Sequence, residues 1–170
     1  HSVSLWNRNP QRLRPILDNG GRVDVDGADH VRSTIAIDRI SGDLGESVEG
    51  ADAAIVVTPS NAHEEIGERF GGLDSFQAPV ILMPGRTYGS YAFTKHFASR
   101  APGSSVTCLE TQTILHACRA EGSLVRIFGT PMAAFDAMNG FNFDTGQAGI
   151  AANEMDLNYY GLYAAAGVSN

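Results

Sequence analysis

The sequence predicts an α/β protein with a mostly parallel sheet and helices on both faces. Short apolar runs alternate with helix-like stretches along the chain, which is typical of repeated strand–helix units. The runs at 53–57 and 80–83 are continuously apolar, as expected for strands buried on both faces of a sheet. With 170 residues, of which 43% are hydrophobic and 18% charged, the chain suits one domain with a buried core.

A strand, a helix and a hairpin are expected in the first third of the chain. Asn9-Pro10 offers an N-cap followed by proline at the first helical position, and Gly20-Gly21 ends the same helix. Asp26-Gly27 is a turn signal between two weak strands. The expected elements are a strand over 3–6, a helix through 13–17, paired strands over 22–25 and 33–37, and a short helix over 44–49.

The middle of the chain carries the strongest strand–helix alternation. Each apolar run there ends in proline, glycine or polar residues, and a helical pattern follows most of them. The expected strands lie over 53–57, 80–83, 105–109 and 124–128, and the expected helices over 62–70 and 91–100.

The composition changes near residue 130. Residues 127–170 contain no Lys or Arg and are rich in Ala, Gly and Asn. We therefore expect residues 1–130 to form the strand–helix domain and 131–170 to form a tail. Two interpretations of the tail stay open: Ala-rich helices that pack on the sheet, or the start of a helical second domain.

The charge and the cysteines exclude several classes of protein. Twelve basic against 19 acidic side chains give a net charge of −7, which argues against binding to nucleic acid or to anionic membranes. No apolar run approaches the roughly 18 residues that span a bilayer, so a cytoplasmic location is expected. Cys108 and Cys118 lack the spacing of a zinc or redox site, and we expect no metal site and reduced, mostly buried thiols.

In open α/β sheets, ligands bind outside the carboxyl ends of the strands, so the residues after each apolar run are the candidates. The first such junction is Asn7-Arg8, after the strand at 3–6. An acidic residue at the end of a dinucleotide-binding strand binds the ribose of NAD, whereas a neutral residue beside Arg suits the 2′-phosphate of NADP. Asn7-Arg8 therefore favours NADP, although an exposed Arg after a strand is often only solvated.

The second junction is Thr58-Pro59-Ser60, which precedes a helix. Free backbone N–H groups at a helix start favour a bound anion or ribose hydroxyls. Alternatively, Ser60 or Asn61 only caps the helix. His63 follows in the first helical turn and is either a general acid or base or an ordinary polar residue of that turn.

The third and fourth junctions are richer in polar groups. Pro84, Gly85, Arg86 and Thr87 follow the strand at 80–83, where glycine permits close backbone approach and Arg can bind a carboxylate or phosphate. A plain turn with a surface Arg is the alternative. The fourth junction follows the strand at 105–109 and predicts a polar pocket lining, formed by Glu110, Thr111, Gln112 and Thr113.

Four strings carry a family resemblance over residues 1–130: LWNRNP at 5–10, VVTPSNAH at 56–63, LMPGRTYGSYAF at 82–93 and LETQTILHACR at 109–119. In this order they resemble the octopine/nopaline (opine) dehydrogenase family. The first two strings are shared more loosely with glycerol-3-phosphate dehydrogenases, which remain an alternative. The lysine-bearing motif of those enzymes is not seen after the strand at 80–83.

The resemblance implies a Rossmann-type fold and NADP (or NAD) as cofactor. It implies reduction of the imine formed from an amino acid and an α-keto acid, with hydride from the nicotinamide. Asn7 and Arg8 would face the adenosine ribose, and residues 58–60 the pyrophosphate or ribose. Residues 84–87 and 110–113 would border the nicotinamide.

The sequence also departs from the family pattern. It contains no GxGxxG loop, and no His follows His116 where the family has its catalytic base. We therefore expect a fold without its first strand–helix unit, assign no catalytic residue, and expect these residues alone to bind cofactor weakly without turnover. An exposed strand edge could pair with a second copy, giving a homodimer. A non-catalytic nucleotide- or metabolite-binding module is the alternative from another class.

Overall fold

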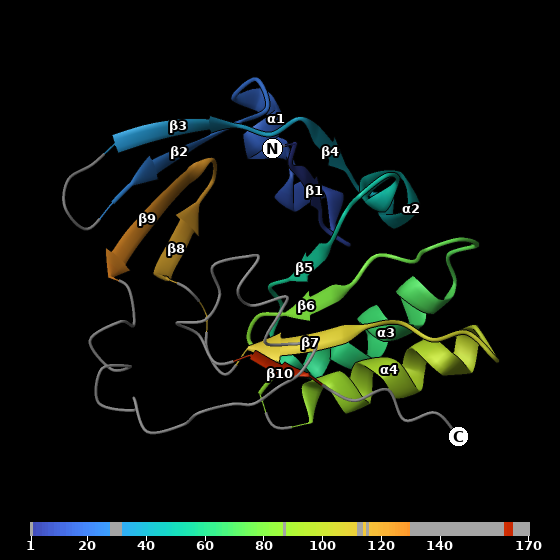
Figure 1. Ribbon diagram of the computed structural model, residues 1–170. Coiled ribbons are helices and arrows are strands. Elements are labelled where there is room, and N and C mark those ends of the chain that lie inside the picture. Colours follow the sequence, from blue (N-terminus) through green and yellow to red (C-terminus); the bar gives the residue numbers. More distant parts are fainter. Residues whose placement is uncertain are drawn as a thin grey trace. The chain divides into compact units, whose positions relative to one another are not determined.

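The computed structural model describes residues 2–27, 32–86, 88–111, 114, 116–129 and 162–164. The chain divides into two compact units (Figure 1). The first unit contains residues 1–50 and 116–131, and the second contains residues 51–115 and 132–170. In the described residues, no helix is both long and apolar enough to cross a bilayer.

The first unit contains two sheets. Strand β1 pairs with β4 in parallel, and the second sheet has the order β3-β2-β9-β8, in which β2 and β9 are parallel and the outer pairs antiparallel. The strands are β1 (Ser4–Trp6), β2 (Arg22–Asp26), β3 (Arg32–Ala36), β4 (Arg39–Ser41), β8 (Ala117–Glu121) and β9 (Leu124–Gly129), and the helices are the 3-10 helix η1 (Pro10–Arg12), α1 (Arg14–Asp18) and α2 (Leu44–Val48).

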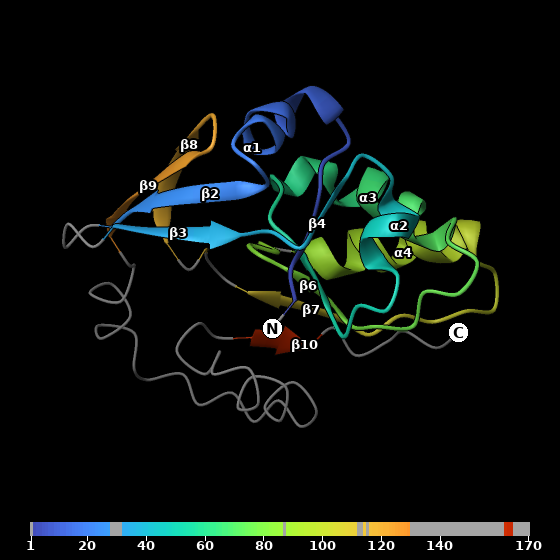
Figure 2. The same cartoon turned by 90° about the horizontal axis from the view of Figure 1, so that it is seen from above.

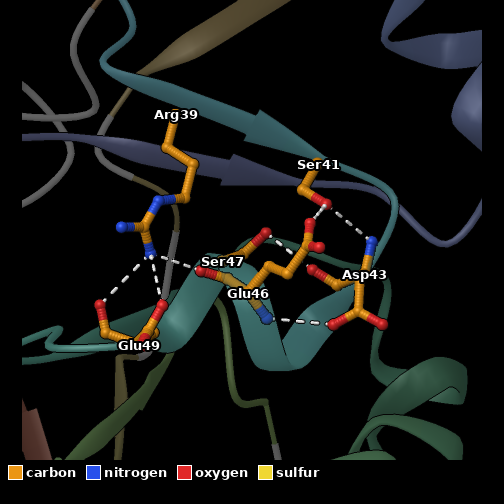
Figure 3. A network of polar contacts seen from close by, with 6 residues as sticks. All are labelled: Arg39, Ser41, Asp43, Glu46, Ser47 and Glu49. Atoms are coloured by element: carbon orange, nitrogen blue, oxygen red, sulfur yellow. Dashed lines mark hydrogen bonds and ion pairs between the residues drawn. The ribbon is translucent and has the colours of Figure 1, made fainter.

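Both ends of the short helix α2 are fixed by side chains (Figure 3). The Asp43 carboxylate accepts the Glu46 N–H at 2.9 Å and so caps the helix start. The Ser41 hydroxyl donates to the Glu46 carboxylate at 2.7 Å. At the other end the Arg39 guanidinium donates to the carbonyls of Glu46 and Glu49. These contacts hold a five-residue helix that is too short to be stable alone.

Removal of the Asp43 cap is expected to loosen the first unit. Asp43→Ala should lower the free energy of unfolding by about 1 kcal/mol, because the Glu46 N–H loses its acceptor. Urea unfolding followed by the fluorescence of Trp6, the single tryptophan, measures the change. Glu49→Ala is the control, since its ion pair with Arg39 is long, 3.9 Å, and exposed. Equal losses in the two variants would contradict the capping role.

The second unit is built on a sheet with the order β10-β7-β6-β5. Strands β5, β6 and β7 run parallel, and β10 pairs with β7 in the antiparallel direction. The strands are β5 (Ala54–Val56), β6 (Val80–Leu82), β7 (Cys108–Thr111) and β10 (Leu162–Ala164), and the helices are the 3-10 helix η2 (Ser60–Ala62), α3 (His63–Gly71) and α4 (Gly89–Arg100).

The core of the second unit lies between β6, β7 and the two longer helices. All three residues of β6 are fully buried. Helices α3 and α4 pack side by side (Figure 2), and the Phe70 and Phe93 rings meet at 5.6 Å between centroids. Gly67 and Gly71 of α3 lie directly on the backbone of α4, since a Cβ at either would come within 2.3 Å of an α4 carbonyl oxygen. The two helices therefore approach closely only because these positions are glycine.

The expected alternation of strands and helices is confirmed, including the antiparallel pairing of β2 with β3. Two details were wrong. Strand β5 was expected to be buried on both faces, but it is an edge strand, and Ile55 and Val57 are 52% and 69% exposed. Strand β7 covers 108–111 rather than 105–109, so Glu110 and Thr111 lie within the strand instead of after it.

Strands β4, β8 and β10 were not predicted from the sequence, and the expectation for one cysteine was wrong. Cys108 is buried as expected, whereas Cys118 is exposed because it lies on β8, whose residues are all exposed. The helices expected in the tail lie outside the described residues, and 162–164 form a strand instead. The boundary near residue 130 also lies outside the described residues and stays a prediction.

Candidate functional site

Three of the four predicted junctions meet at one edge of the second unit's sheet. The register aligns Val56 of β5 with Leu82 of β6, and Leu82 with Glu110 of β7. These three residues lie at the carboxyl ends of parallel strands, so residues 57–60, 83–86 and 111 come together at the same edge. This is the edge at which open α/β sheets bind ligands.

The first junction, Asn7-Arg8, lies in the other unit, directly after β1. The Asn7 side-chain oxygen accepts the Asn9 N–H at 2.9 Å, and the Asn9 side chain caps η1 by accepting the Gln11 N–H at 3.1 Å. The amide of Asn7 therefore shapes the turn after β1. Arg8 is exposed on that turn.

At the second junction the capping interpretation is wrong. Among the residues that the structure describes, no side chain caps η2 or α3, so neither Ser60 nor Asn61 serves that purpose, and both are exposed. Pro59 is exposed as well. The Thr58 hydroxyl is buried, yet it has no hydrogen-bond partner among the described residues. An orphaned buried hydroxyl beside an uncapped helix start marks a place where a bound molecule or water could complete the hydrogen bonding.

His63 is the first residue of α3, in the first helical turn as expected, and its side chain is fully buried. Within the part of the chain that the structure describes, neither ring nitrogen has a partner in hydrogen-bond geometry. Burial lowers the pKa of His63 from its ordinary 6.5, and the Glu110 charge and the backbone of Thr58 raise it only in part. At neutral pH the buried His63 ring is therefore the uncharged imidazole.

The third junction contains two residues with left-handed backbone conformation. Arg86 has a φ of 60° and Tyr88 a φ of 63°, which is costly for residues other than glycine. The Gly85 N–H donates to the Thr111 carbonyl at 2.9 Å and ties the turn to β7. Arg86 and Tyr88 are exposed, Pro84 is half-buried, and Thr87 lies outside the described residues.

The glycines of this junction approach a side chain of the protein itself. A Cβ at Gly85 would lie 2.1 Å from the Glu110 Cβ. A Cβ at Gly89 would lie 2.9 Å from the His63 Nδ1 and 3.3 Å from the Glu110 Oε2. The Glu110 carboxylate in turn accepts the Ser90 N–H at 2.7 Å, at the start of α4. The close backbone approach expected here is thus made to Glu110 and His63.

The fourth junction is described only in part. Glu110 is half-buried and Thr111 is fully buried, whereas Gln112 and Thr113 lie outside the described residues. Cys108, also on β7, is buried, and burial raises the pKa of its thiol to about 12, with a smaller contribution from the Glu110 charge. Cys108 is therefore a neutral thiol without nucleophilic character.

Ser90 completes this site and was not predicted from the sequence. It lies inside the quoted string LMPGRTYGSYAF, but its role depends on a contact with Glu110, twenty residues away. No local pattern signals such a contact. Among the described residues there is no group of three or more His, Cys, Asp or Glu that could hold a metal ion.

Parallel strands with polar residues at one carboxyl edge define an α/β fold of the Rossmann type, and solved structures agree. A yersinopine dehydrogenase in its apo form matches with a TM-score of 0.62 and 15% identity over 76% of this chain and 33% of that chain. An octopine dehydrogenase with NADH and L-arginine matches with a TM-score of 0.59 and 18% identity over 73% of this chain and 31% of that chain. The predicted Rossmann-type fold is therefore confirmed.

The resemblance to the opine dehydrogenase family is also confirmed. An opine dehydrogenase of Arthrobacter sp. (strain 1C) is 31% identical over 120 residues, which are 71% of this chain and 33% of that protein. The chain thus spans about a third of the length of the relative it matches. No family model matches the sequence.

Proposed function

We propose that this chain belongs to an NAD(P)H-dependent oxidoreductase of the opine dehydrogenase type. The observation that carries the proposal is the meeting of three family-like motifs at the carboxyl edge of β5, β6 and β7. The likeness to the Arthrobacter enzyme supports it. The reaction is reduction of the imine that an amino acid forms with an α-keto acid, and the bound cofactor supplies the hydride.

The residues present suit a nucleotide cofactor. The uncapped start of η2 and the orphaned Thr58 hydroxyl offer hydrogen bonds to a pyrophosphate or a ribose. We assign Thr58, Pro59 and Ser60 to that part of the cofactor. Asn7 and Arg8 are assigned to the adenosine ribose and its 2′-phosphate, which makes NADP the preferred cofactor over NAD.

The nicotinamide end and the substrate are assigned to the other two junctions. We place residues 84–87 and 110–113 beside the nicotinamide. Arg86 is exposed at the strand edge, and its guanidinium can bind a substrate carboxylate through two parallel hydrogen bonds. Because the chain spans a third of the relative's length, we propose that these 170 residues alone bind cofactor weakly and do not turn over.

Cofactor preference tests the assignment of Arg8. In fluorescence titrations the chain is expected to bind NADPH more tightly than NADH. Arg8→Ala should weaken NADPH binding about tenfold and leave NADH binding nearly unchanged, because only NADPH carries the 2′-phosphate that Arg8 would bind. Arg14→Ala, at an exposed position of the same unit, is the matched control. A clear preference for NADH would overturn the assignment.

A further inference from the structure

The Glu110 carboxylate is committed to contacts inside the protein. It accepts the Ser90 N–H at 2.7 Å, and its side chain packs against Gly85 on one side and Gly89 on another. Gly85 and Ser90 lie on either side of Arg86 along the chain. One side chain of β7 therefore holds both the turn that leaves β6 and the first turn of α4.

The backbone near Arg86 needs such a constraint. Arg86 and Tyr88 both have left-handed backbone conformation, which is unfavourable for residues other than glycine and persists only where the surroundings enforce it. Described contacts that constrain this backbone include the Gly85 N–H bond to the Thr111 carbonyl and the Ser90 N–H bond to Glu110. The Ala92 N–H also donates to the Tyr88 carbonyl, at 3.0 Å. Without the bond to Glu110, the chain between Gly85 and Ser90 gains freedom, and Arg86 loses its fixed position.

His63 closes the other side of the same cluster. Its ring packs on Gly89, next to the Glu110 Oε2, and is fully buried, with no hydrogen-bond partner in the described ranges. A buried ring at this position leaves the Glu110 side chain little room to rotate away from Ser90. Contact with Gly89 and burial thus make His63 a packing support for Glu110.

We propose that Glu110 is a positioning residue: held by Gly85, Gly89 and His63 and bonded to the Ser90 N–H, it fixes Arg86 in the geometry that binds the substrate carboxylate. The proposal rests on the proposed function for the role of Arg86. Glu110 then borders the nicotinamide pocket, as proposed above, and acts on the substrate through Arg86. Its essential property is then shape and hydrogen-bond acceptance, not negative charge.

Two variants separate these properties. Glu110→Gln keeps the size of the side chain and an oxygen that can accept the Ser90 N–H, whereas Glu110→Ala removes both. With the whole chain saturated with NADPH, pyruvate is the probe of carboxylate binding, followed by the NMR signals of Arg86. Glu110→Gln should bind pyruvate within about twofold of the unchanged chain, and Glu110→Ala should bind it about tenfold or more weakly. Amide spectra of β5 and β6 check that each variant is folded.

NMR spectra recorded without any ligand test the positioning role of Glu110 independently of the proposed function. The Ser90 amide proton should shift upfield in Glu110→Ala, and the Arg86 backbone signals should move with it, whereas Glu110→Gln should change both far less. The positioning role is overturned if Glu110→Ala leaves these signals unchanged. It is also overturned if Glu110→Gln loses pyruvate as fully as Glu110→Ala, because the charge itself would then be required. If the unchanged chain binds neither NADPH nor pyruvate, the proposed function fails, and the ligand-free signals still decide the positioning role.

Discussion

Gly67→Ala is expected to destabilise the second unit by about 2–3 kcal/mol. Alanine normally favours a helix over glycine by up to about 1 kcal/mol, so the expected sign is opposite to helix propensity. The reason is contact with backbone: the new Cβ would lie 2.3 Å from the Phe93 carbonyl oxygen and 3.1 Å from two further backbone atoms of Phe93. Backbone cannot rotate away as a side chain can, so α3 and α4 must separate and loosen the packing around Phe93.

Gly72→Ala is the matched control for this experiment. Gly72 follows the last residue of α3, has a φ of −83° that any residue adopts, and its Cβ would meet no atom closer than 3.5 Å. Urea unfolding followed by circular dichroism should therefore show little change for Gly72→Ala and a lower midpoint for Gly67→Ala. If both variants unfold at the same midpoint, the close contact between the two helices is not what Gly67 provides.

The sequence predicted those parts of the fold whose signals are local. The apolar run at 80–83 predicted β6, and the Gly71-Gly72 pair predicted the end of α3, because burial and chain reversal each require particular residue types at neighbouring positions. Strands β4 and β8 show no such local pattern. Strand β8 is wholly exposed and β4 is short and polar, and both exist because β9 and β1 offer them a backbone to pair with. Such pairing is a property of the assembled sheet and not of the segment.

For the candidate site, the location could be predicted from the sequence, but the contacts of its side chains could not. Parallel strands end at one edge, so Thr58, Arg86 and Glu110 could be placed together before the fold was known. The use of Glu110 could not be predicted, because its partner Ser90 lies on another element. The glycines at 85 and 89 indicated a close approach correctly, but a sequence does not show whether the approaching atom belongs to a ligand or to the protein.

The stability of the chain is expected to fall at mildly acidic pH because of His63. Burial lowers the pKa of His63 in the folded state below the 6.5 of the unfolded chain, so the unfolded state takes up a proton first as the pH falls. The contribution of His63 to stability is therefore fully present above pH 6.5. It is lost below that pH at up to about 1.4 kcal/mol per pH unit until the folded-state pKa is reached.

Unfolding midpoints measured from pH 8 down to pH 5 test this dependence. His63→Leu fills the same buried position without a titrating group and should remove the His63 share of the decline. His116→Leu, at an exposed histidine, is the matched control and should retain that decline. The same slope in His63→Leu as in the unchanged chain would mean that His63 is not held neutral. Because the Glu110 charge raises the pKa of His63, Glu110→Gln should lower it further and extend the decline to more acidic pH. The two groups are thereby linked in a measurement that needs neither cofactor nor substrate.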